Sequence, residues 1–474
     1  MTFFIVLSSL TLLAAAPADK PVDTGTISSS NASYDGNALI LKGQVILDHG
    51  LGKMQAEEAV LQKQEVGKEF PFSLIHLEKD VSLKLQQNGE LKCENADLDF
   101  SALKGFLTSS KKVSYVDTLK KRKGKSNSFQ LISKAIDLQF SKKSDQSKTS
   151  YDVQNVLARE NVELTYDGDF TLFTDAISYQ KELVNATGNE FRSHLSSQGA
   201  QKCKLVHLAD TIEADHFDLD VVQNKLIMTN PQGILPSLSK GEVRFTAQDL
   251  LWDHDRNTLI LKGNPSVQEP NLGTLVSDQE ICLFQKDKNL VGFKSHGKTT
   301  LTYLNNHQLI SHGTLSFDRE RNVGNVDSPL VNGVIPEGLQ LSYNEGEMSV
   351  LADKATIEYS EENGSFQPIS VSLKGHVKIS SQAADKPARF GLADRLTYSP
   401  TTRTFILGAD PGKKVVFVND EDNLKISAQE VHITQDPTTK KQTVKGLGNV
   451  QLALSAEEQA SLNKYFGKYA PPAP

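Results

Sequence analysis

The sequence is poor in the residues that organise small metal-bound or disulfide-bonded folds, because only three of its 474 residues are cysteines. Cys93, Cys203 and Cys282 lie far apart and match no metal-ligand spacing. Each stands where the local pattern places a small or apolar residue, so we interpret them as core residues, although an exported chain could pair two of them. The sequence therefore predicts no metal site.

An excess of positive charge is also lacking, because 51 lysine and arginine residues stand against 58 aspartate and glutamate residues. The net charge is -7 at pH 7 and the isoelectric point is about 5.9. Nucleic-acid binding depends on a basic surface that neutralises phosphates. The charge balance therefore argues against nucleic acid as a partner.

Catalytic patterns are absent as well. The sequence contains no phosphate-binding loop, nucleophile elbow or paired metal motif. His254 lies between Asp253 and Asp255, but no other fixed partner is visible, so we interpret it as a turn residue after a strand. We therefore expect neither an enzyme nor a cofactor.

Long hydrophobic runs are missing after the N-terminus. The apolar stretch from Phe3 to Leu13 is shorter than the ~20 residues that span a bilayer. Small residues follow it, and Ala16-Pro17-Ala18 matches a cleavage pattern. The sequence predicts a signal peptide over residues 1–18 and export to a secretory or periplasmic space, with an uncleaved anchor as the alternative.

A repeated phrase organises the rest of the chain. An Ala-Asp/Glu marker recurs in eleven copies, including "MQAEEAVL" at Met54, "VLADKATIEY" at Val350 and "GLADRLTY" at Gly391. The spacing from Ala352 to Ala393 is 41 residues and that from Ala393 to Ala428 is 35. Periods of this length are typical of repeat architectures.

Within a copy, apolar residues alternate with polar ones. In "LILKGQVIL", Leu39 and Leu41 share a face that Lys42 avoids, which indicates half-buried strands. Gly43, Gly263 and Gly375 interrupt the strands at the same place, which predicts a bend or bulge. Turn signals separate the strands, so the fold class is all-β and antiparallel.

Three segments depart from the repeat. Residues 109–128 are rich in lysine, which we interpret as a solvated loop or a basic patch for phosphorylated sugars or lipids. Residues 329–340, starting "PLVNGVIPEG", are a candidate joint. Ser455 and Glu458 form a capping-box pattern, so residues 455–474 are expected to hold a short helix and a disordered tail. This helix could cover the last open strand edges.

The phrases "KGQVILDHG...MQAEEAVL", "GHVKIS...GLADRLTY" and "VLADKATIEY" resemble the organic-solvent-tolerance (OstA-like) family of lipopolysaccharide transport proteins. That family includes the periplasmic bridge protein and the periplasmic domain of the outer-membrane assembly protein. The resemblance implies an elongated, folded-over antiparallel jellyroll of two facing sheets over residues 19–454. It also implies an interior groove for the acyl chains of lipopolysaccharide.

The resemblance and the alternation together suggest a set of groove residues. The implied partners are lipopolysaccharide or a similar amphiphile, and other β-jellyroll transport proteins or further copies that pair edge to edge. The groove residues are Leu39, Leu41, Val45, Leu47, Val81, Leu83, Leu85, Val162, Leu164, Leu259, Leu261, Leu373, Val377 and Ile379.

Two other hypotheses remain open from the sequence. A repeat-built β scaffold or surface interaction protein without lipid cargo is favoured if the inward residues seal into a dry core. An enzyme on a β-helix, such as a carbohydrate lyase, requires clustered acids or bases on neighbouring turns. A periplasmic lipid-binding and bridging protein is the function that the sequence favours over both.

Overall fold

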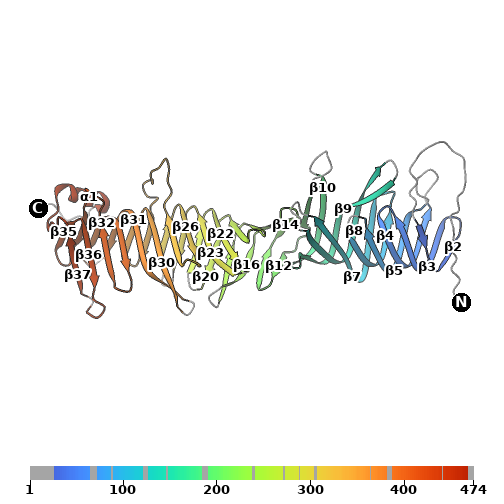
Figure 1. The fold of residues 1–474 in the computed structure, drawn as a ribbon, viewed down its shortest axis with the longest axis horizontal. Helices are drawn as coiled ribbons and strands as arrows, with labels where there is room; N and C mark the ends of the chain where they lie inside the picture. Colours follow the sequence, from blue (N-terminus) through green and yellow to red (C-terminus); the bar gives the residue numbers. More distant parts are fainter. Residues whose placement is uncertain are drawn as a thin grey trace. The chain divides into compact units, whose positions relative to one another are not determined.

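The structure is a computed structural model, and its described residues form an all-β, antiparallel fold of 37 strands with one short helix (Figure 1). This confirms the predicted fold class. The predicted signal peptide and the last residues of the tail lie outside the described part of the chain. The structure describes residues 26–63, 72–86, 89–120, 126–145, 148–183, 191–237, 241–270, 273–287, 289–303, 307–362, 365–381, 387–439 and 441–467.

The chain divides into two compact units. The first unit comprises Met1–Asp167 and Ala176–Ser193, and the second comprises Gly168–Asp175 and His194–Pro474. Strands β10 (Phe170–Leu183) and β11 (Phe191–Ser197) therefore contribute residues to both. The two units are described separately below.

The first unit is a meander in which each strand from β3 to β8 pairs with the next one along the chain. The short strands β1 and β2 both pair with β3. The strands are β1 (Thr26–Ser28), β2 (Asn31–Tyr34), β3 (Ala38–His49), β4 (Gly52–Lys63), β5 (Phe72–Leu85), β6 (Glu90–Asp99), β7 (Lys104–Lys120), β8 (Ser126–Asp145) and β9 (Lys148–Tyr166).

The long strands of the first unit bend at a bulge near their middle. In β3 and β4, the register shifts between Lys42 and Val45, at the predicted bend. Gly43 at this point has a φ of +79°, which is in the left-handed region that glycine adopts without strain. The bulges let each strand turn a corner, so its two halves face each other across the interior.

The second unit is built instead from short strands in two hydrogen-bonded series. In the series that we call the first sheet, neighbours follow the order β12 (Cys203–His207), β13 (Asp210–Ala214), β16 (Gln232–Ser237), β17 (Gly241–Thr246), β20 (Ser266–Glu269), β21 (Gly273–Ser277), β24 (Thr299–Thr302), β25 (Gln308–Ser311), β28 (Leu341–Glu345) and β29 (Met348–Ala352).

Successive hairpins along the chain belong alternately to the two sheets, so the remaining hairpins form the second sheet. Its order is β11, β14 (His216–Asp220), β15 (Lys225–Thr229), β18 (Asp249–Asp253), β19 (Thr258–Lys262), β22 (Glu280–Lys286), β23 (Asn289–His296), β26 (Thr314–Asp318), β27 (Val323–Asp327) and β30 (Lys354–Glu362).

Long bent strands return at the C-terminal end of the second unit. Strands β31 (Ser365–Ser381) and β32 (Arg389–Ser399) pair with both sheets. The first sheet then ends with β34 (Val415–Asn419) and β35 (Leu424–Ala428). The second sheet ends with β33 (Thr404–Gly408), β36 (Glu430–Gln435) and β37 (Gln442–Leu447).

One side of the second unit carries the crossings between the sheets, and we call this side the spine. The repeated acid or amide lies there, as at Gln248, Asp353 and Gln429, each directly before the strand on the far side of the crossing, β18, β30 and β36 respectively. Backbone hydrogen bonds connect neighbouring crossings, such as Gln429 N–H to Gly448 C=O at 2.9 Å. The hairpin turns lie at the other end of the strands, and we call this side the mouth.

The Lys-rich stretch is a strand over most of its length, so the loop interpretation was wrong there. Residues 109–120 belong to β7, where apolar Val113 and Tyr115 point inward. Lys111 and Lys112 are exposed because the register shift between Thr108 and Val113 pushes them out of the ladder. The alternation of apolar and polar residues therefore makes this stretch a strand, despite its many lysines.

The candidate joint at residues 329–340 lies inside the second unit, between β27 and β28. The division between the units falls instead around residues 167–194. Residues 329–340 form part of one long crossing on the spine.

The predicted capping box is confirmed, but the helix covers a different surface of the sheets from the one expected. Helix α1 (Ala456–Phe466) begins after Ser455, whose side chain accepts the Glu458 N–H. Leu462 and Phe466 pack on Phe390 and two valines of β34, which lie on the outer face of the first sheet. The helix thus covers a face rather than a strand edge, because apolar outward residues on β32 and β34 supply a surface for it.

Candidate functional site: the interior faces

Both units place apolar residues on their inner faces, but only the second leaves a long row of that face accessible. In the first unit, residues such as Leu77, Leu107 and Leu164 are fully buried. The interior there is packed as a dry core, which is the normal state of a folded domain.

Aromatic rings close the mouth of the first unit. The register of β8 and β9 shifts a second time between Gln139 and Phe140, beyond the shift at the bend. The ring centroids of His49 and Phe100 lie 4.1 Å apart, and Tyr151 stacks on His49 at 5.2 Å. The Tyr151 N–H donates to the Gly50 carbonyl at 3.0 Å, which ties β9 to the turn after β3.

Burial changes the acid-base behaviour of this closure. His49 is only 4% exposed, and its burial lowers its pKa to about 4, although the charge of Asp48 opposes the shift. The ring is therefore neutral at ordinary pH. A neutral imidazole packs among aromatic rings without a desolvation penalty for charge.

A buried polar network completes the closure of the first unit. The Tyr115 hydroxyl donates to Asp117 at 2.9 Å, and Lys181 lies 3.4 Å from a carboxylate oxygen of Asp152. Burial raises the pKa of Asp117, although hydrogen bonds from Tyr115 and the Thr118 N–H oppose the shift. Polar groups from distant strands meet here because each needs a partner once it is buried.

The mouth of the second unit is bridged near its first strands. Asp169 precedes β10, which pairs with β12 of the first sheet, whereas His254 follows β18 of the second sheet. Their side chains approach to 3.0 Å, and His207 lies 2.9 Å from Asp210 on the same rim. Trp252 packs edge-on against the His207 ring at a centroid distance of 5.2 Å. This contact links the two sheets at the closed end of the unit.

Further along the second unit the interior opens. Along the mouth-side inner row of the second sheet, Trp252, Leu259 and Leu283 are buried. From Phe293 onward the row becomes half-exposed. The half-exposed residues of this row are Phe293, Phe317, Ile357, Val371, Tyr398, Phe405 and Ile433.

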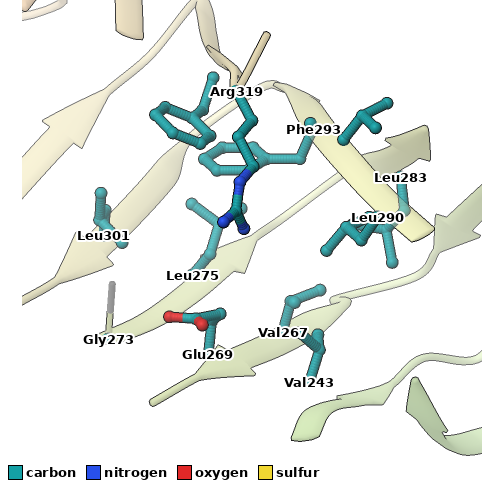
Figure 2. Close-up of a pocket in the computed structure, with 13 residues that line it drawn as sticks. Val243, Val267, Glu269, Gly273, Leu275, Leu283, Leu290, Phe293, Leu301 and Arg319 are labelled. Carbon is teal, nitrogen blue, oxygen red and sulfur yellow. The ribbon is translucent and has the colours of Figure 1, made fainter. Parts of the chain in front are cut away.

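An apolar cavity marks where the opening begins. It has a volume of about 50 Å³ and is lined by inward residues of both sheets, including Leu275, Leu301 and Phe293. Figure 2 shows these side chains converging from strands of the two sheets. A second cavity of about 20 Å³ shares Phe293, Leu301 and Phe317 with the first and extends toward Tyr359. We call the two cavities and the half-exposed row beyond them the open groove.

Charged groups stand at the rim of the open groove. Arg319 follows β26, and its guanidinium donates to Glu361 at 2.6 Å. Glu269 ends β20 in the opposite sheet, and in Figure 2 the Arg319 side chain reaches across the cavity toward it. The groove therefore has apolar walls and a polar rim, an arrangement suited to an amphiphile with an apolar chain inside.

Tyrosines line the open groove near the mouth. Burial raises the pKa of Tyr303 and of Tyr359, so both hydroxyls stay neutral. The Tyr359 ring meets Phe317 edge-on at a centroid distance of 5.7 Å. Rings in this arrangement offer apolar faces without introducing charge.

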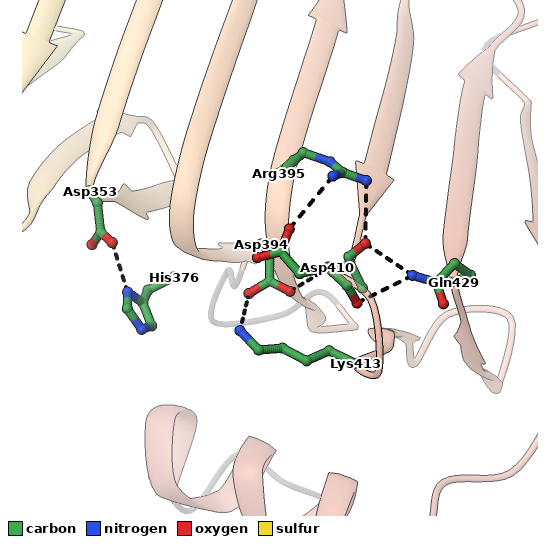
Figure 3. A network of polar contacts seen from close by, with 8 residues as sticks. Asp353, His376, Asp394, Arg395, Asp410, Lys413 and Gln429 are labelled. Atoms are coloured by element: carbon green, nitrogen blue, oxygen red, sulfur yellow. Dashed lines mark hydrogen bonds and ion pairs between the residues drawn. The ribbon is translucent and has the colours of Figure 1, made fainter.

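The spine is polar and structural. Asp353 lies 2.7 Å from His376, and Lys413 donates to Asp394 at 2.8 Å (Figure 3). Burial alone would raise the pKa of Asp394, but hydrogen bonds from the Asp410 N–H and Lys413 outweigh it and lower the pKa. These contacts hold neighbouring crossings together and lie away from the mouth.

The predicted groove residues all face the interior, yet most of them are sealed. Only Leu39, Leu85 and Ile379 are half-exposed. The eleven others are at most 7% exposed: Leu41, Val45, Leu47, Val81, Leu83, Val162, Leu164, Leu259, Leu261, Leu373 and Val377. Alternation identified the inner face correctly, but it gave no information on accessibility.

Sequence reasoning missed the residues that line the open groove. Phe317 and Tyr359 lie on strands that alternate regularly, whereas Gly292 and Phe293 stand next to each other in a less regular strand. Their register partners could have been found only by aligning each hairpin with the next but one, because the two sheets alternate along the chain.

No group of three or more His, Cys, Asp or Glu residues in the described part of the chain could hold a metal ion. Cys93 and Cys203 are buried, as predicted for core residues, whereas Cys282 is only half-buried, and all three thiols are free. Burial raises the pKa of Cys93 to about 12. The described residues also contain no helix that is long and apolar enough to cross a membrane.

Comparison with known proteins gives likenesses to solved structures but none in sequence. No family model and no curated protein matches the sequence. A solved structure, LptH from Pseudomonas aeruginosa, is described as the LptA-homologous periplasmic component of a lipopolysaccharide transport device. It is 8% identical, with a TM-score of 0.24 over 31% of this chain and 94% of LptH. At these values the likeness carries no inference about this chain.

Proposed function

We propose that this chain is a non-enzymatic, periplasmic lipid-binding protein that carries lipopolysaccharide or a similar amphiphile in the open groove of its second unit. The observation that supports the proposal is the change in exposure along one inner row. Leu283 is buried, but its register partner Phe293 is half-exposed. The later residues of the row that carry large side chains are half-exposed as well. An accessible apolar strip of this kind normally marks a ligand site or an interface.

The chemistry of the groove fits acyl chains. Its walls come from leucine, valine and aromatic side chains, and the charged Arg319 and Glu269 stand at the rim. A chain placed between the sheets would bury apolar surface at about 25 cal/mol per Å². The polar part of the amphiphile would remain at the mouth.

The ends of the sheets suggest how such a protein would join a longer path. Among the described residues, β37 pairs only with β36, so its outer edge remains available. Exposed strand edges can pair with a strand of another chain. We therefore include edge-to-edge pairing with other β-jellyroll proteins, or with further copies, in the proposal.

Site-specific photo-crosslinking tests the cargo assignment. A photoreactive phenylalanine analogue at Phe317 should capture lipopolysaccharide in the periplasm of a bacterial host, because this ring borders the open groove. The same analogue at outward-facing Ser316, the neighbouring position on β26, should capture little. Equal capture at both positions would contradict the proposal.

A scaffold without lipid cargo is the second candidate function. The specific observation that favours it is the sealed interior of the first unit, where Leu164 and Tyr166 are fully buried. In that case the crosslinker at Phe317 would capture no lipid, and the first unit would serve as a binding surface for other proteins.

A further inference from the structure

One crossing on the spine of the second unit is unlike the others. Most crossings use one to three residues, such as Asp353 between β29 and β30. The crossing between β27 and β28 uses residues 328–340. Its base is fixed, because the Leu341 N–H donates to the Ser328 hydroxyl at 2.9 Å and Gln340 donates to Asp353 at 2.8 Å.

The tip of this crossing is an ordered apolar turn. Leu330, Val331 and Val334 are 62%, 55% and 68% exposed, respectively. No charged residue occurs from Ser328 to Pro336. Single exposed apolar residues are ordinary, but three within five residues form a patch that requires a partner.

The two ends of the turn are joined through their backbones. Val331 and Val334 exchange two hydrogen bonds, at 2.9 and 3.1 Å, around Asn332 and Gly333. Both central residues have positive φ, which is the signature of a type I′ turn. The proline at each end, Pro329 and Pro336, has no N–H to leave unpaired. The tip can therefore enter the hydrated interface of a bilayer with this pair of hydrogen bonds intact.

The surroundings of the base also suit a lipid interface. Lys378 lies 3.4 Å from Gln340 and also stands over the ring of Tyr465, 4.0 Å from its centroid. Tyr465 on α1 is 42% exposed, and Lys464 lies 5.4 Å from the same ring. Tyrosine and lysine are the residues that anchor proteins at the level of lipid headgroups.

We propose that the turn at residues 329–336 inserts into the interface of a lipid bilayer and docks the second unit on a membrane by its spine. The partner is a bilayer rather than a protein, because the tip carries no charge to select a protein and the base beside it carries the tyrosine and lysines suited to lipid headgroups. This proposal is independent of lipid cargo, because the tip lies on the spine and the open groove faces the mouth.

Vesicle flotation of the purified full-length protein tests the proposal. The wild type should float with phosphatidylcholine vesicles, and the fraction bound should not change with salt, because apolar contact drives the binding. For the variant Val331→Asp/Val334→Asp, the fraction bound to vesicles should be about tenfold smaller, because two carboxylates would have to be desolvated. Leu208→Asp, at a residue 64% exposed on the mouth side, is the matched control and should bind like the wild type.

A fluorescent variant gives an independent readout. The native Trp252 is 3% exposed and should not respond to vesicles. Val334→Trp should show a blue shift with vesicles and quenching by lipids brominated on their acyl chains. A lipid held in the groove would leave this tryptophan unchanged, so the result separates docking from cargo binding. A wild type that does not float, or an aspartate variant that floats equally well, would overturn the proposal.

Discussion

The first unit and the C-terminal half of the second unit use the same alternation, yet one is sealed and the other is open. In the first unit, an extended hairpin and a buried polar network close the mouth. In the second unit, short hairpins end at the mouth and leave Phe317 and Tyr398 half-exposed. The accessibility of an inner face therefore depends on what lies beyond the strand ends rather than on the inward residues themselves.

The largest difference in the free energy of unfolding should appear when one inward-facing ring in each region is truncated to alanine. Phe129 is 1% exposed, with Tyr179 at a centroid distance of 5.0 Å, so Phe129→Ala should lower the free energy of unfolding by ~3–5 kcal/mol. Phe317→Ala should cost about half as much, because its ring already contacts solvent. Urea denaturation measures both. Equal losses would mean that the two interiors are equally packed.

Acid should weaken the sealed unit through His49. Its folded-state pKa of about 4 lies below the unfolded value of 6.5, so the unfolded chain binds a proton first as the pH falls. The stability is complete above pH 6.5 and decreases by about 3 kcal/mol down to pH 4. The raised pKa of Asp117 acts in the opposite direction over its own titration.

The His49→Phe variant is the control for this pH dependence. It keeps an aromatic ring beside Phe100 and Tyr151 but cannot bind a proton. Its unfolding free energy should fall less between pH 6.5 and 4 than that of the wild type. An identical pH profile in the variant would show that His49 is not the group responsible.

The bends and the helix cap could be predicted from the sequence because each depends on local chemistry. Gly43 and Gly375 stand at points where the chain must adopt positive φ, and Ser455 with Glu458 forms a reciprocal cap. These patterns involve residues close together in the chain. They therefore leave a signal in a single sequence.

The difference between sealed and open interiors could not be predicted in this way. Val156 and Val371 both face inward, each four residues before the bend of its strand, yet only Val371 is half-exposed. The closure that seals the first unit brings Asp117, Asp152 and Lys181 together from three strands. Long-range contacts of this kind follow from tertiary packing, which the alternation of one strand does not encode.

Glycines at the strand bends of the two units offer a smaller test of the same comparison. A Cβ at Gly375 would lie 2.2 Å from an oxygen of Asp353, whereas a Cβ at Gly43 in the first unit would lie 3.1 Å from Ser30. Both glycines have positive φ, which costs alanine ~1–2 kcal/mol. We expect Gly375→Ala to lose about 1 kcal/mol more than Gly43→Ala, because Asp353 must also move.

Gly346→Ala is the control for the backbone term. Gly346 has a φ of +57°, and a Cβ added there would meet no atom within 4 Å. Thermal unfolding of the three variants separates backbone strain from contact. If Gly375→Ala were no worse than Gly346→Ala, the contact between Gly375 and Asp353 would have no energetic role in the open unit.

The helix cap should give the smallest effect, and it distinguishes a covered face from a covered edge. Ser455→Ala should destabilise α1 by ~1 kcal/mol, because the Glu458 N–H loses its acceptor. Since α1 packs on Phe390 and Val416, amide exchange should become faster along β32 and β34. Ser461→Ala, inside the same helix and exposed, is the control and should not speed exchange. If α1 instead protected a strand edge, the Ser455→Ala protein would self-associate at high concentration while β34 kept its protection, and the outer-face packing described above would be wrong.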